Sequence, residues 1–420
     1  MPRKSNVPGK RTTRRGSHAA RDSGTAVDHT TEDSPMPDWL KALEKSDPGA
    51  REREARLLAE PHISAEQHSR ARQLSLGEEV LRKTRVYLDL KYWIYCRDAR
   101  GGHAQKPAHV EMWRLLSELT AANRVVCPVT YPILAETLRQ GNRDTRKQTA
   151  EVVDILSQRV AIQPSDVLEG TELAHFWYSH IKGKDGVYPL RRLVWMFSGW
   201  LIGQPTLQVP ALDDSTVNWM RKCIFDRLAA ADFSMIVDAL SEGDSAGRDE
   251  YSELHDKLNA GAAEHRHEVT SFEAVFLSEV AGILDVMKPR ITNLLANTFT
   301  AATNAAPPPP SSRDAQEATR MATNLIYHAY RLRKLTIEFP ALHIGAGLHA
   351  AARLQDPPYR RGDLWDFRHA HPALAYCSAF FTEKKLGNVL CRPPLNYDTA
   401  YGCTVLWNDD AIVEYLRSLE

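Results

Sequence analysis

Acidic side chains follow short apolar runs at several points in the sequence. Asp89 lies near the end of the run at 86–90, and Glu383 comes two residues after the run at 378–381. Several carboxylates brought together without cations repel one another, and a divalent metal removes that conflict. Oxygen ligands of this kind need no His or Cys and favour Mg²⁺ or Mn²⁺. The predicted metal ligands and catalytic residues are Asp89, Glu136, Asp366 and Glu383, with Asp363 as a further candidate ligand.

A metal held by these acids would activate a water molecule and neutralise the charge on a phosphoryl group during its transfer. Basic side chains near the acids, such as Lys385 and Arg360, would offer local positive charge to a polyanion. A neighbouring hydroxyl group would orient Glu383 or a bound water. The predicted substrate-binding residues are Lys91, Thr382, Lys384 and Arg361.

Short strands must position these acids. In the first part of the chain, strands are expected at 86–90, 125–129 and 159–162, because β-branched and apolar runs of this length are typical of strands. Helical patterns between them give the order β-α-β-α-α-β, which favours a parallel sheet with right-handed crossovers. The carboxyl ends of such strands share one rim, where ligands bind in open α/β sheets.

The same pattern returns near the C-terminus. Strands are expected at 378–381 and 402–407, and Asp409 is expected to cap a last helix. Between about 166 and 300 we expect only helices, including one at 190–202. The sequence therefore predicts an α/β fold in which one parallel sheet is interrupted by a large, all-helical insertion.

Composition shifts suggest the domain organisation. The first 21 residues contain seven Lys and Arg and no acid, and so few apolar groups that an ordered core is not expected. Such a tail either scans phosphates or is a solvated terminus. The expected units are a disordered basic tail at 1–35, N-terminal helices at 36–85, the first half of the α/β domain at 86–165, a helical insertion at 166–335 with a Pro-rich linker at 301–313, and the second half at 336–420.

The overall composition is that of an ordinary globular protein. The formal net charge is zero, so nothing in the whole chain favours nucleic acid or a membrane, and any basic patch is local. The six cysteines form no C-x-x-C pair, which suits reduced thiols. No signal-peptide pattern and no apolar run of about 18 residues is present. We therefore expect a cytoplasmic protein without a membrane partner, and the sequence does not fix its oligomeric state.

Three segments together resemble a known family. The order VYLDLKYWI, VCPVTYPILAETL and DLWDFRHAHPALAYCSAFFTEKKL is similar to that of the PIN-domain nucleases and their PIN-like relatives. The resemblance covers about 86–163 and 340–420. It implies a three-layer α/β/α sandwich on a parallel sheet and metal-dependent hydrolysis of RNA, less often DNA, phosphodiesters. In a toxin-type nuclease it would also imply an inhibitory protein partner.

The resemblance extends to individual acids. It implies that Asp89 is the first acid of the site and Glu136 the second, that Asp366 rather than Asp363 is the third, and that Glu383 is the fourth. This chain departs from the family pattern in three ways. The commonest fourth acid is Asp, many relatives carry an Asp where this chain has Ser378, and the helical insertion lies outside the minimal fold.

Each acid also has a plainer interpretation. Asp89 and Asp363 could cap helices, and Glu136 could interact only with a helix dipole. His369 and His371 are expected on the helix surface or behind the ligands, although a proton-shuttle role is open. The leading function is a metal-dependent ribonuclease. The alternatives are a catalytically degenerate PIN-like module that binds RNA or protein, and a phosphatase-like hydrolase.

Overall fold

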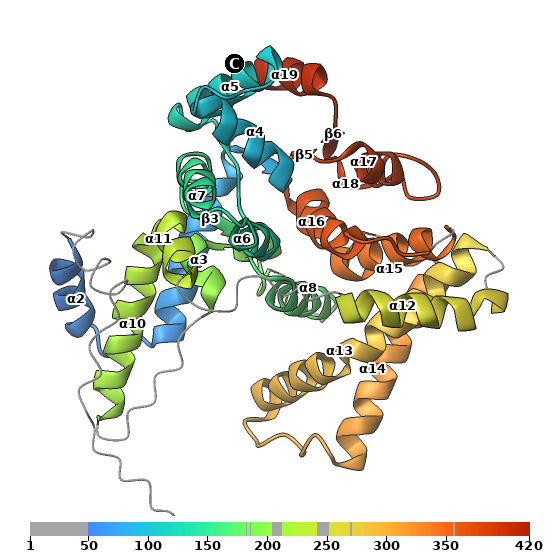
Figure 1. Ribbon diagram of the computed structural model, residues 1–420. Coiled ribbons are helices and arrows are strands. Elements are labelled where there is room, and N and C mark those ends of the chain that lie inside the picture. Colours follow the sequence, from blue (N-terminus) through green and yellow to red (C-terminus); the bar gives the residue numbers. More distant parts are fainter. Residues whose placement is uncertain are drawn as a thin grey trace, which may run out of the picture.

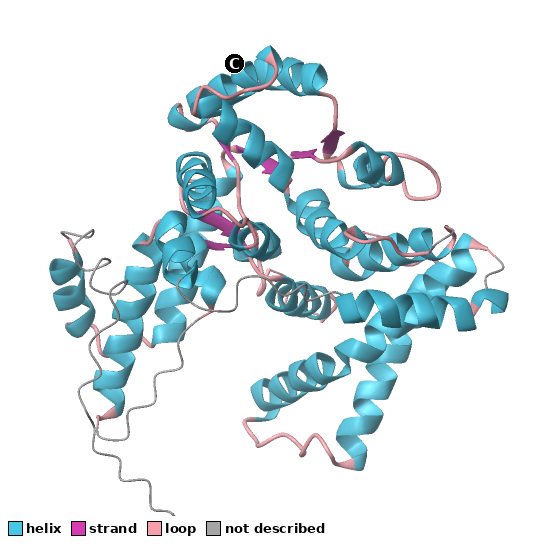
Figure 2. Ribbon diagram, in the orientation of Figure 1, coloured by secondary structure: helices cyan, strands magenta, loops and turns pink. Residues whose placement is uncertain are grey.

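A parallel sheet of four strands organises the fold (Figure 1). The computed structural model describes residues 49–181, 183–184, 186–203, 212–241, 252–268, 271–335, 337–355 and 358–420. It is mixed α/β and 69% helical, and the helices surround a small number of short strands (Figure 2). The tail predicted at 1–35 lies outside the described residues.

The strand order places the two halves of the sequence side by side. The sheet runs β2-β1-β5-β6, and all three neighbouring pairs are parallel. The chain leaves β1 toward β2 on one side, whereas β5 leads to β6 on the other, so the strand order reverses between β1 and β5. In open α/β sheets such a switch point is where ligands bind. The strands are β1 (Thr84–Leu88), β2 (Val125–Val126), β5 (Ala379–Phe381) and β6 (Thr404–Leu406).

Both faces of this sheet are buried. Successive side chains of a strand point to opposite faces, and here Val86 and Leu88 join one apolar cluster while Tyr87 and Phe380 join another. Burial on both faces explains why the strands are continuous apolar runs in the sequence. The first cluster includes α4 (Leu90–Arg100), α5 (Pro107–Ala121), α7 (Arg143–Ser157) and α19 (Asp409–Arg417), and the second includes α3 (Ala65–Leu81), α15 (Pro340–Arg353), α16 (Asp363–Tyr376), α17 (Lys384–Leu390) and α18 (Tyr397–Tyr401).

A second, two-stranded sheet corrects two predictions. β3 (Val160–Ile162) pairs antiparallel with β4 (Trp195–Phe197), and a single parallel bridge from Val129 to Ala161 connects it to the extension of β2. The expected full parallel pairing of 159–162 is therefore wrong, and so is the expectation of only helices in this part of the chain, because β4 separates a short helix at Leu190–Leu193 from a 3-10 helix at Ser198–Ile202. A three-residue apolar run cannot be distinguished from a buried helix segment by periodicity, and its partner lies far away in the sequence.

The described helices of 165–335 contribute to several apolar clusters and do not form one separate core. Trp200, Phe225 and Phe233 pack in the cluster on one face of the main sheet, whereas Val280 and Ile326 belong to a separate cluster with helix α15. These helices are α8 (Ser165–Ser179), α9 (Leu190–Leu193), η1 (Ser198–Ile202), α10 (Asp214–Ala230), α11 (Phe233–Ser241), α12 (Ser252–Glu264), η2 (Arg266–Glu268), α13 (Phe272–Thr303) and α14 (Arg313–Arg331).

The Pro-rich stretch joins two helices that pack on each other. It connects α13 to α14, which together project away from the main sheet (Figure 1). Ahead of the main sheet, α2 (Ala50–Leu58) packs against α10. Among the described residues, no helix is both long and apolar enough to cross a membrane.

Candidate metal centre

The centre begins at the carboxyl ends of β1 and β5. These strands are neighbours in register, with Leu88 opposite Phe381, and Asp89 follows β1 directly. The backbone N–H of Asp89 donates to the Phe381 carbonyl at 3.0 Å. Glu383 follows β5 after one further residue. Strand pairing therefore brings two acids that are almost 300 positions apart to one rim of the sheet.

Asp89 and Glu383 both occupy positions where a helix starts, but neither side chain makes a capping hydrogen bond. Instead, the hydroxyl group of Thr382 donates to Asp89 Oδ2 at 3.3 Å. Thr382 is fully buried, so it holds Asp89 in place, whereas the sequence predicted a contact with substrate or with Glu383. Asp89 is thus the N-cap residue of α4 by position, but its carboxylate does not cap the helix, and the capping interpretation of that carboxylate is wrong.

Glu136 and His369 meet opposite Asp89. Glu136 projects from α6 (Tyr131–Leu138), and its Oε2 lies 3.0 Å from Nε2 of the buried His369 on α16. One potential ligand atom from each of Asp89, Glu136 and His369 lies within 4.8 Å of the others. The arrangement therefore converges two carboxylates and an imidazole on a volume that one ion could share.

A buried hydrogen-bond chain fixes the imidazole ring. The Tyr87 hydroxyl group lies 2.7 Å from His369 Nδ1 and 2.7 Å from the Thr130 hydroxyl oxygen. Tyr87 is fully buried, and burial raises the pKa of its phenol well above the ordinary value. The phenol therefore stays protonated, and it leaves His369 Nε2 directed at Glu136.

Asp366 lies one helical turn before His369, on the same side of α16. Burial, followed by repulsion from Asp89, raises the pKa of Asp366 to about 7. Burial also raises the pKa of Asp89, although the nearby His369 partly opposes this. Burial favours neutral His369, yet the carboxylates of Glu136, Asp89 and Asp366 raise the pKa of the imidazole to about 9. The acids outnumber this one cation, which is the charge imbalance that a divalent ion would relieve.

Asp363 stands apart from the other acids. Its Oδ2 accepts a hydrogen bond from the Arg360 backbone N–H at 2.9 Å, and its Oδ1 pairs with the Lys385 ammonium group. The N-cap residue of α16 is Gly362, so the prediction that Asp363 caps the helix is wrong. Its carboxylate already has a cation as its partner, which distinguishes it from Asp366.

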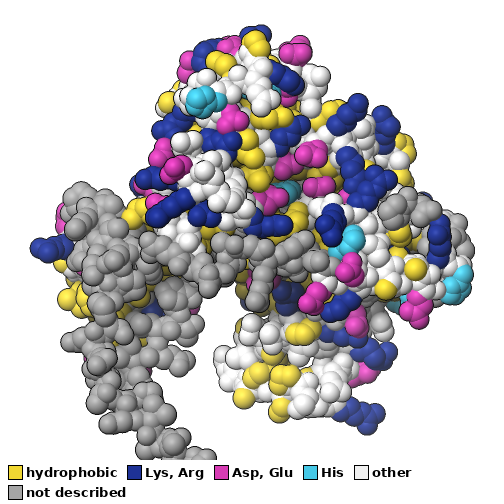
Figure 3. All heavy atoms as spheres, viewed as in Figure 1, with side chains coloured by type: hydrophobic (Ala, Val, Ile, Leu, Met, Phe, Trp, Pro, Cys, Tyr) yellow, Lys and Arg dark blue, Asp and Glu magenta, His cyan; other side chains and the backbone are white. Residues whose placement is uncertain are grey.

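Positive side chains flank the acids. Lys384 and Arg361 are exposed, and neither forms an ion pair with another described residue. Lys91 lies over an aromatic ring instead, with Nζ 5.3 Å from the centre of Tyr92. Acidic groups gather near the centre of the face shown in Figure 3, and Lys and Arg side chains lie on either side of them. This charge distribution would suit a ligand that carries several negative charges.

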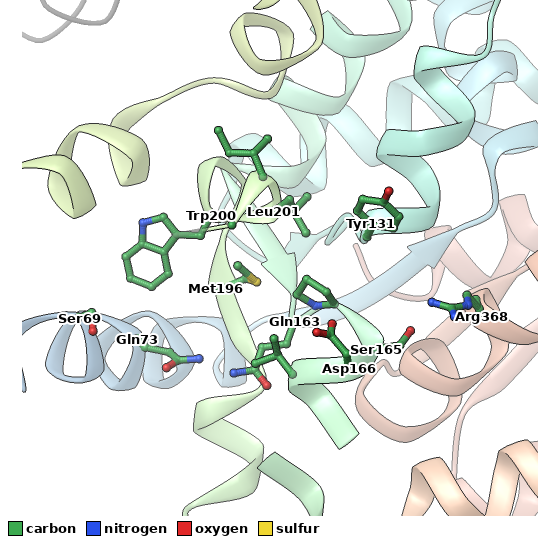
Figure 4. A pocket seen from close by; sticks show the side chains of 14 residues that line it. Ser69, Gln73, Tyr131, Gln163, Ser165, Asp166, Met196, Trp200, Leu201 and Arg368 are labelled. Carbon is green, nitrogen blue, oxygen red and sulfur yellow. The ribbon is translucent and has the colours of Figure 1, made fainter. Parts of the chain in front are cut away.

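The acids of the centre differ in exposure: Glu383 is exposed, Glu136 and Asp366 are partly buried, and Asp89 is buried. The cavity beside Asp366 measures only about 20 Å³. A larger cavity of about 690 Å³ is lined by Tyr131, Trp200, Asp166 and Arg368 among other residues (Figure 4). None of the acids of the centre lines that larger cavity.

The sequence pattern predicted Asp89 and Glu136 of the three converging residues but missed His369, and it also predicted Asp366 and Glu383, which lie nearby but outside this group. Of the two positions expected for His369, the helix surface is wrong, because the imidazole is buried beside Asp89 and Glu136, whereas a place behind the ligands stays a prediction. The available signal was the spacing Asp366-x-x-His369, which puts both side chains on one face of a helix.

Comparisons with known proteins returned no match, whether to protein-family models, to curated proteins or to solved structures. The fold and the centre define the protein only as a mixed α/β protein with an acidic rim at the switch point of a parallel sheet.

Proposed function

We propose that the protein is a metal-dependent ribonuclease with a PIN-like, three-layer α/β/α core. The observation that carries this proposal is the convergence of acids from separate parts of the chain at the switch point of the sheet. In this proposal Asp89, Glu136, Asp366 and Glu383 hold a Mg²⁺ or Mn²⁺ ion. The bound ion supplies an activated water and neutralises charge on a phosphate oxygen.

The remaining groups have distinct tasks in this proposal. Thr382 holds Asp89 through its hydroxyl group. Lys384 and Arg361, which are exposed beside the acids, bind phosphates on either side of the cleaved bond. Lys91 contributes its charge, and its ammonium group lies over the Tyr92 ring. The choice of a polymeric substrate, and of RNA over DNA, rests on the resemblance of the three sequence segments.

The test is cleavage of RNA by the purified protein with Mn²⁺. We expect Asp89→Asn to reduce the rate by at least about a hundredfold, because even the groups that support metal ligands contribute ten- to hundredfold. Asp98→Asn is the matched control: Asp98 lies on the same helix and pairs with Arg97. Equal rates for the wild type and Asp89→Asn would contradict the proposal.

One observation favours the degenerate binding module as the second candidate. The His369 imidazolium already neutralises Glu136, and Lys385 neutralises Asp363, so protein cations satisfy two of the five acids. If the wild type binds RNA but cleaves none with Mg²⁺ or Mn²⁺, this second candidate replaces the first.

A further inference from the structure

We propose that His369 is itself a metal ligand through Nε2, and that the centre consequently prefers a first-row transition ion such as Mn²⁺ to Mg²⁺. This inference rests on the proposed metal centre, to which it adds a ligand and a metal preference. The four acids alone predict neither the His369 ligand nor the metal preference, because a site made only of oxygen ligands accepts Mg²⁺ and Mn²⁺ alike.

The first argument is the spacing of the ligand atoms. His369 Nε2 and Glu136 Oε2 lie 3.0 Å apart. Two ligands bound at about 2.1 Å and at right angles on one ion are separated by about 3.0 Å. A carboxylate oxygen of Asp89 completes the group, since all three atoms lie within 4.8 Å of one another. An ion can therefore be accepted between these atoms without large movement of the chain.

The second argument is the orientation of the ring. Histidines that bind metals usually form a hydrogen bond through their other nitrogen, which fixes the tautomer. Here Nδ1 contacts the Tyr87 hydroxyl group, and that group can donate its own proton to Thr130. In this direction of bonding Nδ1 carries a proton, and an ion that displaces the proton on Nε2 would bind the lone pair there. Tyr87 is thus a positioning residue.

The third argument is the contrast with His371, which lies on the same helix two residues further on. Its Nε2 lies 2.8 Å from Glu172 Oε1. Glu172 also accepts hydrogen bonds from the Tyr376 hydroxyl group at 2.5 Å and from the Ala341 backbone N–H at 2.6 Å. That carboxylate is saturated by protein donors. His371 is therefore the matched control for His369.

Calorimetric titration of the metal-free protein with Mn²⁺ alone and with Mg²⁺ alone tests the metal preference. We expect the wild type to bind Mn²⁺ at least about tenfold more tightly than Mg²⁺, because an imidazole nitrogen suits transition ions better. His369→Asn should weaken Mn²⁺ binding by about ten- to hundredfold and change Mg²⁺ binding much less. His371→Asn should keep the wild-type ratio. An unchanged ratio in His369→Asn would overturn the preference.

Pulsed electron paramagnetic resonance of the Mn²⁺-loaded protein tests the bond itself. We expect coupling to a directly bound imidazole nitrogen in the wild type and in His371→Asn, and none in His369→Asn. No nitrogen coupling in the wild type, or its persistence in His369→Asn, overturns the assignment. If His369→Asn does not fold, Tyr87→Phe replaces it. That variant should keep the nitrogen coupling while losing about tenfold in Mn²⁺ affinity.

These measurements contain no RNA, so the two proposals can fail separately. If nitrogen coupling is observed but no metal supports RNA cleavage, His369 is still a metal ligand and the ribonuclease proposal is wrong. If the protein cleaves RNA but the spectrum shows only oxygen ligands, the ribonuclease proposal stands and the assignment of His369 as a ligand is wrong.

Discussion

Helix α16 carries two buried histidines, and each pairs with a glutamate from a different helix. His369 meets Glu136 at the rim of the main sheet, while His371 meets Glu172 among α8, α15 and α16. The two pairs have nearly the same length, 3.0 and 2.8 Å. They differ in their surroundings: several acids without a cation of their own among the described residues face the first pair, whereas hydrogen-bond donors hold the second and the acid near it, Glu169, pairs with Arg290.

This difference separates a candidate site from a structural contact. Glu172 is fully buried and is satisfied by an imidazole, a phenol and a backbone N–H. Glu136 is partly exposed and shares its imidazole with other carboxylates that have raised pKa values. A buried ion pair is thus no indication of function by itself. Uncompensated charge of one sign around the pair is the informative feature.

The largest expected effect comes from breaking the His371–Glu172 pair, whose carboxylate accepts hydrogen bonds from several protein donors. Glu172→Ala should lower the free energy of unfolding by about 3–5 kcal/mol, because it leaves a buried imidazole and phenol without their partner. Glu136→Ala should cost less than half as much, since it also relieves repulsion with Asp89. Chemical denaturation of both variants measures the difference. Equal losses would mean that the two pairs are energetically alike.

The next effect is the pH dependence of the metal-free protein. A carboxyl group with a raised pKa in the folded state stabilises the fold when protonated, and this contribution is lost as pH rises. The pKa of Asp366 is about 7 against an ordinary value of 3.8, so the free energy of unfolding should fall between about pH 4 and 7. The fall is at most about 4 kcal/mol. Asp366→Asn should flatten this slope in denaturation series, and an unchanged slope would contradict the charge imbalance.

Binding of Mn²⁺ at the rim should offset the loss of stability that the crowded carboxylates cause in the metal-free protein. Mn²⁺ at a hundred times its dissociation constant should raise the free energy of unfolding by about 2.7 kcal/mol. Thermal unfolding with and without Mn²⁺ measures the gain. Asp89→Asn should abolish most of it, whereas His371→Asn should retain it. A similar gain in both variants would indicate ion binding elsewhere on the molecule.

The smallest expected effects come from removing the hydroxyl groups of two buried tyrosines, one beside each histidine–glutamate pair. Tyr376→Phe should cost about 1.5–3 kcal/mol of unfolding free energy, because the phenol donates to the Glu172 carboxylate. Tyr87→Phe should cost about 1 kcal/mol, since its partners are Thr130 and an imidazole nitrogen. Denaturation curves at one pH decide the order. The reverse order would show that the Tyr87 contacts contribute more to folding than to positioning His369.

Local sequence determined the elements of this fold and most of the acids of the centre. The apolar run at 378–381 became β5 (Ala379–Phe381), and the expected helix at 144–157 became α7 (Arg143–Ser157). Asp89, Glu383 and Asp366 stand at a strand end or a helix start that is encoded within a few residues of each. Short-range patterns suffice here because strand and helix propensities act on neighbouring residues.

Tertiary structure decided which groups meet. Only strand pairing reveals that Thr382 supports Asp89, and only the packing of α17 against α16 gives Asp363 its Lys385 partner. The last helix shows the same limit, because its cap is Asn408 while the predicted cap, Asp409, pairs with Lys106 at 2.7 Å.

The different surroundings of the two histidines likewise depend on tertiary contacts. His369 and His371 lie two residues apart on one helix, and apart from the spacing to Asp366 nothing local distinguishes them. Their partners come from α6 and α8, more than 190 positions away. Hydrogen bonds and charge repulsion depend on distance in space, so the sequence alone determined where the acids stand, and the tertiary fold decided which histidine joins them.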